Sequence, residues 1–205
     1  MRASNCLTKT MSAINLEQLY KEKIRPSFTE GGTNVHAAAR ITKVVMNVGV
    51  GKFAAGRRLR GSGKAQSEAD LVSDIATMLA DITGQKAKVV IARKSIAGFK
   101  LREGSVVGLT VTLRGRRMYD LVGRLIHIAL PRTRDFRGIS AGGVDQDGNL
   151  TIGMRDMTIF PEVAQSTLVF GCEITLVTNT KDRAAAMALF EALGMPFEKK
   201  EEKKA

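Results

Sequence analysis

The 205-residue chain has few of the residues from which metal sites, disulfide frameworks and base-stacking surfaces are built. Its two cysteines, Cys6 and Cys172, are too few and too far apart for a disulfide framework or a zinc site. Because only His36 and His127 accompany them, no cluster of Cys and His ligands is available, and we expect no metal or other cofactor. Aromatic residues make up 5% of the chain and Trp is absent, which argues against a surface made mainly of stacked bases.

Long apolar runs are missing as well. None approaches the ~18–20 residues that a membrane-spanning helix needs, so we expect no membrane partner. Acids are absent before Glu17, whereas residues 1–14 contain Arg2, Lys9 and several Ser, Thr and Asn residues. This composition weakly resembles an organellar transit peptide, but a flexible extension with Met11 as the functional start is the interpretation we favour.

Positive charge is abundant, and it is concentrated in one part of the chain. The net charge of the chain is +12, and residues 86–137 hold 13 basic residues against three acids. The basic residues are Lys86, Lys88, Arg93, Lys94, Lys100, Arg102, Arg114, Arg116, Arg117, Arg124, Arg132, Arg134 and Arg137. Residues 138–205, in contrast, hold seven basic and ten acidic residues. A concentrated positive stripe is typical of a nucleic-acid surface, whereas a merely soluble basic protein spreads its charge along the chain.

Hydrophobic periodicity predicts interspersed helices and strands. Apolar residues at helical spacing predict helices at 15–29, 67–82, 116–129 and 181–193, the third of them ended by Pro131. Short β-branched or alternating runs predict strands at 41–50, 87–93, 106–114, 149–154 and 169–178. The connections are too irregular for a repeating βαβ array. We therefore predict an α+β fold in two layers, with a mainly antiparallel or mixed sheet, helices packed on one face and the other face open to a ligand.

The same pattern predicts the domain organisation. We expect one α+β domain over residues 15–197, preceded by the extension at 1–14 and followed by a charged disordered tail at 198–205. Residues 52–66 are rich in Gly, Arg and Lys, and we expect them to form an inserted basic loop.

Three short patterns match enzyme or metal signatures but lack the context that those signatures need. GISAG at 138–142 matches a nucleophile elbow, yet no His follows His127 and no buried strand precedes the Ser. GVG at 49–51 resembles a dinucleotide fingerprint, but further glycines interrupt the helix that must begin there. DQDGN at 145–149 fits a tight turn better than a calcium loop. We predict that the chain is not an enzyme, and a nucleotide-dependent enzyme using the turn at 49–54 is the alternative.

Several longer motifs, in one order along the chain, resemble the bacterial-type family of large-subunit ribosomal protein L5. The motifs are VVMNVGVG (44–51), TGQK (83–86), KSIAGFKLREG (94–104), VTLRG (111–115), RMYDLVGRLIHIALPRTRDFRG (117–138), IFPE (159–162) and ALGMPF (192–197). This resemblance implies a non-catalytic α+β protein that binds 5S ribosomal RNA in the central protuberance of the large subunit. It also implies contacts with 23S-type ribosomal RNA and neighbouring large-subunit proteins.

The resemblance further implies which residues bind ribosomal RNA. In the family the open face of the sheet receives 5S RNA, and the positions matching its polar contacts are Asn47, Gln85 and Thr112. Lys86 and Arg114, in the neighbouring motifs, are the expected phosphate contacts. The alternative is that the three polar side chains hydrogen-bond only to local backbone groups of the protein.

Two further segments resemble family loops that face transfer RNA or the small subunit. The loop from Arg93 to Arg102 resembles the one that reaches P-site transfer RNA, and Phe99 within it either stacks on RNA or anchors the loop. The segment 131–149 resembles the loop that faces transfer RNA and a small-subunit protein across an intersubunit bridge. The implied contacts are Arg93, Lys94, Ser95, Phe99, Lys100, Arg102, Arg132, Arg134 and Arg137.

Two departures from the family pattern bear on localisation and function. The basic loop at 52–66 is longer than usual, and the N-terminal extension leaves the compartment open. We expect a cytoplasmic, ribosome-bound protein of a bacterium, with an organellar ribosome as the alternative. A basic RNA chaperone without a preferred target is the third functional hypothesis.

Overall fold

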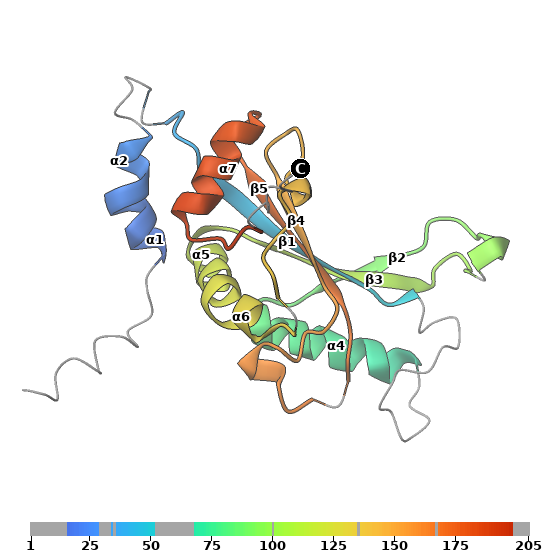
Figure 1. The fold of residues 1–205 in the computed structure, drawn as a ribbon. Coiled ribbons are helices and arrows are strands. Elements are labelled where there is room, and N and C mark those ends of the chain that lie inside the picture. The colour runs from blue at the N-terminus through green and yellow to red at the C-terminus, as the bar shows by residue number, and fades with distance from the viewer. Residues whose placement is uncertain are drawn as a thin grey trace, which may run out of the picture.

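The computed structural model describes residues 16–28, 34, 36–51, 68–99, 101–134, 136–166 and 168–198. The expected extension at 1–14, the inserted loop at 52–66, Lys100 and all of the tail beyond Glu198 lie outside the described residues. The described residues form a five-stranded sheet with the strand order β2-β3-β1-β5-β4, and helices lie against it (Figure 1).

Every strand pairing among the described residues is antiparallel. The strands are β1 (Ile41–Gly49), β2 (Lys88–Ile91), β3 (Val106–Leu113), β4 (Leu150–Met154) and β5 (Cys172–Thr178). β1 lies in the centre between β3 and β5, and β2 and β4 form the two edges. The five predicted strands are confirmed, although β5 begins at Cys172 instead of at residue 169.

The predicted helices are also confirmed, with one error at a boundary. The long helices are α4 (Glu68–Thr83), α5 (Gly115–Arg124) and α7 (Arg183–Ala192). The N-terminal helical segment comprises α1 (Leu16–Leu19), the π-helical turn η1 (Tyr20–Ile24) and α2 (Arg25–Ser27). α5 continues through a second π-helical turn, η3 (Leu125–Ala129), into α6 (Leu130–Arg132). None of the described helices is long and apolar enough to cross a bilayer.

The prediction that Pro131 ends the third helix was wrong, because helical structure continues through Arg132. Pro131 stands in the first turn of α6, directly after the π-helical turn. Proline is tolerated at such a position because its fixed φ suits the start of a helical segment. Short 3-10 turns complete the described elements: η2 (Ala97–Phe99), η4 (Ala141–Gly143) and η5 (Pro161–Val163).

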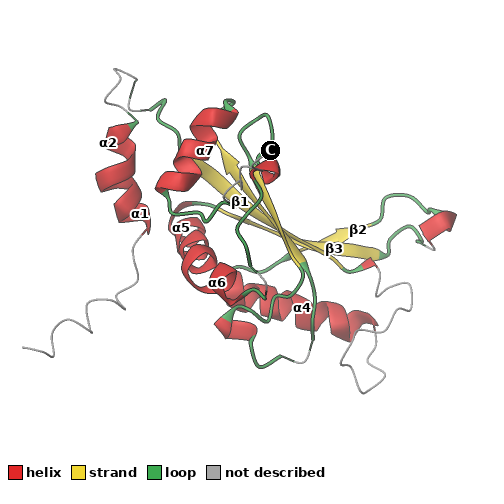
Figure 2. Cartoon of the chain, viewed as in Figure 1, coloured by secondary structure: helices red, strands yellow, loops and turns green. Residues whose placement is uncertain are grey.

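One face of the sheet is covered by helices, which confirms the predicted two-layer α+β fold (Figure 2). Alternate residues of β1, such as Met46, are fully buried, since successive residues of a strand point to opposite faces. They belong to one core cluster with Leu79 of α4, Leu121 of α5 and Phe190 of α7. The helices that supply these side chains therefore cover this face of the sheet and make it inaccessible to a ligand.

The N-terminal helical segment packs on α5. The ring of Tyr20 stacks on that of Tyr119 with centroids 6.0 Å apart, and its hydroxyl donates a hydrogen bond to the carbonyl oxygen of Ala39 at 2.8 Å. Burial raises the pKa of Tyr119 to about 12, because the phenolate would be desolvated there. These contacts tie the N-terminal segment to the helical layer.

An ion pair fixes the helical layer at its other end. Arg124 of α5 pairs with Glu162, next to Pro161 at the start of η5, and donates a second hydrogen bond to the carbonyl oxygen of Ile82 at 2.8 Å. His127 of η3 is exposed, whereas the Arg124 side chain contacts two other segments of the protein.

Candidate RNA interface

The face of the sheet that turns away from the helices is polar. Burial alternates along the strands, so the residues between the buried ones share this second face. We call it the open face, and its strand residues are Lys43, Val45, Asn47, Gly49, Lys88, Val90, Gly108, Thr110, Thr112, Thr151, Gly153, Glu173, Thr175 and Val177. The open face is thus made mostly of Thr, Asn and Gly, and its charged strand residues are Lys43, Lys88 and Glu173.

The structure brings the three predicted polar contacts to this region. Asn47 is exposed, and its Oδ1 accepts a hydrogen bond from the hydroxyl of its register partner Thr110 at 2.7 Å. Gln85 is half-buried, and its Nε2 donates to the backbone oxygen of Thr112 at 3.3 Å. The hydroxyl of Thr112 makes no hydrogen bond to any residue that the structure describes. The local-backbone alternative therefore describes Gln85 in the free protein, but it does not describe Asn47 or Thr112.

Basic side chains stand at the rim of the open face. Lys86 is exposed and is separated from Lys88 by the buried Ala87, so both lysines lie on the same side of the chain. Lys88 pairs with Thr110, which places it on the open face. Arg114 is exposed, its backbone is extended (φ −140°, ψ 164°), and its side chain makes no cap bond to α5. Sequence reasoning missed Lys88 as a site residue, although the alternation of KAK at 86–88 signals it.

Glycines leave free space above part of the open face. A hollow of about 500 Å³ is lined by Asn47, Gly49, Gly108, Glu173 and their neighbours. A Cβ at Gly108 would lie 2.8 Å from the carbonyl oxygen of Val48, so this position requires glycine. A Cβ at Gly49 would meet no atom of the described residues within 4 Å. The hollow is therefore open to a ligand approaching the sheet.

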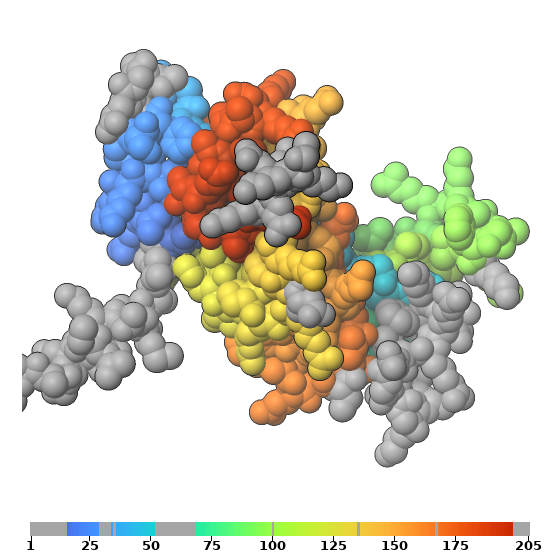
Figure 3. All heavy atoms as spheres, in the orientation of Figure 1, coloured from blue at the N-terminus to red at the C-terminus, as the bar shows by residue number. Residues whose placement is uncertain are grey.

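The connection between β2 and β3, described at residues 92–99 and 101–105, forms an arm that projects from the body (green at the right of Figure 3). An isolated bridge between Ile96 and Leu101 closes its tip, and the Oγ of Ser95 accepts a hydrogen bond from the backbone N–H of Glu103 at 2.9 Å. Ser95 therefore has a structural role in the arm. The predicted basic residues Arg93, Lys94 and Arg102 are exposed on it.

Phe99 lies at the tip of the arm with 76% of its surface exposed. It forms part of the 3-10 turn η2 and has no place in the core cluster. Of the two predicted roles, anchoring of the arm is therefore not what the structure shows. An exposed aromatic ring among basic residues is suited to stacking on RNA.

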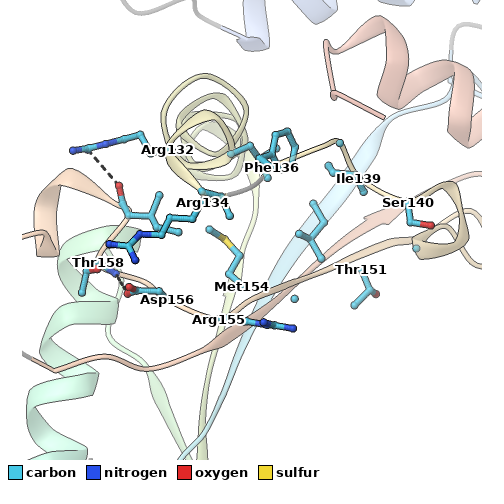
Figure 4. A pocket seen from close by; sticks show the side chains of 17 residues that line it. Arg132, Arg134, Phe136, Ile139, Ser140, Thr151, Met154, Arg155, Asp156 and Thr158 are labelled. Carbon is cyan, nitrogen blue, oxygen red and sulfur yellow. Dashed lines mark hydrogen bonds between the residues drawn. The ribbon is translucent and has the colours of Figure 1, made fainter. Parts of the chain in front are cut away.

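The loop that follows α6 borders a second concave site. A cavity of about 1020 Å³ lies between this loop and β4, with Arg132, Arg134 and Arg155 in its lining (Figure 4). Arg132 donates a hydrogen bond to the carbonyl oxygen of Ile159 at 3.3 Å. Arg137 is exposed but does not line the cavity, so the structure groups two of the three predicted arginines and adds Arg155.

The geometry also argues against reading the enzyme-like sequence patterns as active sites. The Oγ of Ser140 accepts a hydrogen bond from the N–H of Gly142 and caps η4, so it is not presented on a strand-to-helix elbow. β1 pairs antiparallel on both sides, whereas a dinucleotide fingerprint belongs to a parallel βαβ unit.

The DQDGN pattern forms the predicted tight turn. Asp145 accepts hydrogen bonds from the N–H (2.7 Å) and the side-chain amide (3.0 Å) of Asn149, and these bonds lower the pKa of Asp145. Gly148 supplies the positive φ of 76° that the turn requires. Within the described ranges, no three His, Cys, Asp or Glu side chains are grouped so as to hold a metal.

Comparison with known proteins agrees with this geometry. Residues 60–102 match the family model "Ribosomal protein L5", and residues 106–197 match the separate model for the C-terminus of the same ribosomal protein family. The chain is 44% identical over 186 residues to large ribosomal subunit protein uL5 of Synechocystis sp., covering 89% of this chain and 97% of the relative. The chain belongs to the ribosomal protein L5 family. Proteins of the L5 family are structural and not enzymatic, so the prediction that the chain is not an enzyme is confirmed.

Other L5 relatives show the same extent of similarity. The protein uL5 of Prochlorococcus marinus is 42% identical over 190 residues, covering 91% of this chain and 99% of the relative. The protein uL5c of Paulinella chromatophora is 41% identical over 188 residues, covering 90% and 98%. The predicted family resemblance is thereby confirmed along nearly the whole chain.

Proposed function

We propose that this L5 protein is a structural constituent of the large ribosomal subunit that binds 5S ribosomal RNA in the central protuberance through its open face. The observation that carries the proposal is the two-sided sheet: the described helices cover one face, and the other is polar and glycine-rich and is not covered by them. A rim of Lys86, Lys88 and Arg114 gives this face the positive charge that a phosphate backbone requires.

On this surface, charged groups and hydrogen-bonding groups contribute to RNA binding in different ways. Contacts from the basic rim to phosphates supply affinity that falls as salt rises. Once RNA covers the open face, the Asn47 amide and the Thr112 hydroxyl lose water and need partners. A polar group left without one costs about 1–3 kcal/mol, so RNA that fails to offer matching groups is rejected. In this proposal the polar centre therefore determines specificity for the RNA, and the basic rim supplies most of the affinity.

The arm and the loop after α6 serve other ribosomal partners in this proposal. The arm carries Phe99 and the basic residues Arg93, Lys94 and Arg102 away from the body, as contact with P-site transfer RNA requires. The loop with Arg132, Arg134 and Arg137 faces transfer RNA and a small-subunit protein across an intersubunit bridge. Further contacts join 23S-type ribosomal RNA and neighbouring large-subunit proteins.

Binding of the purified full chain to 5S RNA and to a length-matched structured RNA, measured across a salt series, tests the main proposal. We expect tight binding that selects 5S RNA and persists at physiological salt. Equal affinity for the two RNAs, disappearing together as salt rises, would instead identify a basic RNA chaperone without a preferred target.

The role of the arm needs an assay on whole ribosomes. Large subunits reconstituted with Phe99→Ala or Arg102→Ala protein should release P-site transfer RNA faster than wild-type subunits, while the free variants bind 5S RNA normally. Lys23→Ala, at an exposed lysine of the N-terminal helical segment, is the matched control. Unchanged release from the arm variants would contradict the proposed contact.

A further inference from the structure

A carboxylate stands in the middle of the surface proposed to bind a polyanion. Glu173 of β5 is exposed on the open face, where it is the register partner of both Asn47 on β1 and Gly153 on β4. No Lys or Arg of the described residues forms an ion pair with it. Its charge is therefore presented to whatever covers the open face.

The chemistry of a carboxylate limits what can lie against it. An ionised carboxylate has only acceptor oxygens, so it repels phosphates and binds N–H and O–H donors. RNA offers such donors on its 2′-hydroxyls and on the edges of its bases. The surroundings of Glu173 are those of a base site, because the register partner Asn47 adds an amide that both donates and accepts.

The hollow on the open face supplies the room that a base needs. Glu173 and Asn47 line it together with Gly49 and Gly108, which have no side chains to fill it. A base can enter only if it is unpaired, since the groups on its Watson–Crick edge are otherwise occupied. Guanine presents two adjacent donors on that edge, N1–H and the N2 amino group, which match the two oxygens of a carboxylate.

We propose that Glu173 binds the Watson–Crick edge of an unpaired guanine of the RNA, held in the hollow beside Asn47. This inference rests on the proposed function, because it takes the open face as the RNA-binding surface. Glu173 then acts as a specificity residue: it contributes nothing to general affinity for RNA and favours only an RNA that places a guanine at this point.

The direction in which a charge-removing substitution changes the affinity for 5S RNA tests the proposal. Glu173→Gln removes a negative charge, so if phosphates lay nearby it would strengthen RNA binding. We expect it instead to weaken 5S binding about 5- to 150-fold, as expected for loss of a bidentate base contact, with an unchanged salt slope. Glu191→Gln, at an exposed position of α7, removes the same charge on the covered side and should leave 5S affinity unchanged. Tighter or unchanged binding of Glu173→Gln would overturn the proposal.

Base identity is tested with 5S transcripts in which guanosines are randomly replaced by inosine, which lacks the N2 amino group. Wild-type protein should discriminate against inosine at a specific position, and Glu173→Gln should lose that discrimination. A contact to a 2′-hydroxyl would give no inosine effect and would overturn the guanine assignment. Failure of wild-type protein to select 5S RNA would overturn the proposed function as well, whereas selective wild-type binding with an unaffected Glu173→Gln variant would overturn this inference alone.

Discussion

The two faces of the sheet are made by the same strands, one residue apart, and they have opposite properties. On β1, Val44, Met46 and Val48 are 0–2% exposed against the helices, while Val45, Asn47 and Gly49 look outward. Because side chains alternate between the two faces of a strand, one set of residues in β1 stabilises the core and the other set is available to bind a ligand. A one-residue shift of register would exchange the two sets, so the hydrophobic side fixes where the polar side must lie.

The open face itself also divides into a centre and a rim. Its centre is polar with few charges, whereas Lys86, Lys88 and Arg114 stand at its border. Contacts to phosphate position a nucleic acid without reading its sequence, and polar groups in the centre can discriminate between RNAs. Substitutions on the covered face, in the centre and at the rim should therefore have separable effects.

The largest effect is expected on the covered face. Leu121→Ala removes a fully buried side chain of α5 and should lower the free energy of unfolding by about 2–5 kcal/mol, measured by urea denaturation. The folded fraction of the variant should bind 5S RNA with wild-type affinity. A loss of affinity in the folded fraction would show that the two faces are not independent.

In the centre of the open face, Thr112→Ala should lower the affinity for RNA and leave the free energy of unfolding unchanged. We expect it to weaken 5S binding by about 1–3 kcal/mol while the salt slope stays the same, because an uncharged partner of the RNA is lost. Asn47→Ala should behave in the same way. Thr77→Ala, at an exposed threonine of α4, is the control and should bind normally. Wild-type affinity of Thr112→Ala would remove the proposed role of the centre.

At the rim, we expect a smaller effect, which is a change in the salt dependence of 5S affinity. Lys86→Ala should reduce the salt slope of 5S binding by roughly 0.7–0.9, since one phosphate contact releases its counterions. The exposed Lys23 lies on the N-terminal helical segment, and Lys23→Ala should leave the slope unchanged. Equal slopes for the two variants would mean that net charge, and not its location, determines binding.

The smallest effect concerns alkaline pH and the helical layer. Burial raises the pKa of Tyr119 from 10.0 to about 12, so the folded state keeps this phenol neutral when the unfolded chain ionises. Its contribution to stability should be complete below pH 10 and should be lost as the pH rises toward 12. Tyr119→Phe should flatten this decline in urea denaturation series. A decline of equal steepness in the variant would exclude Tyr119 as its source.

Local pattern predicts much of the fold and part of the site. The short β-branched run at 41–50 predicts a strand, and β1 confirms it. The neighbours of Asn47 could not be predicted, because β5 follows β1 by more than a hundred residues and its register depends on non-local pairing. Glu173 was missed for this reason, and so was the Arg124–Glu162 ion pair, which joins two distant segments.

The measurement that tests the central claim most directly is the 5S affinity of Gly49→Val. A Cβ added at this position would meet no atom of the described residues within 4 Å, and valine favours strands, so the variant should fold stably. If the open face binds RNA, the valine fills the hollow and should lower 5S affinity at least about tenfold, the effect of about 1.4 kcal/mol. Wild-type affinity in this stable variant would show that RNA does not contact the open face there.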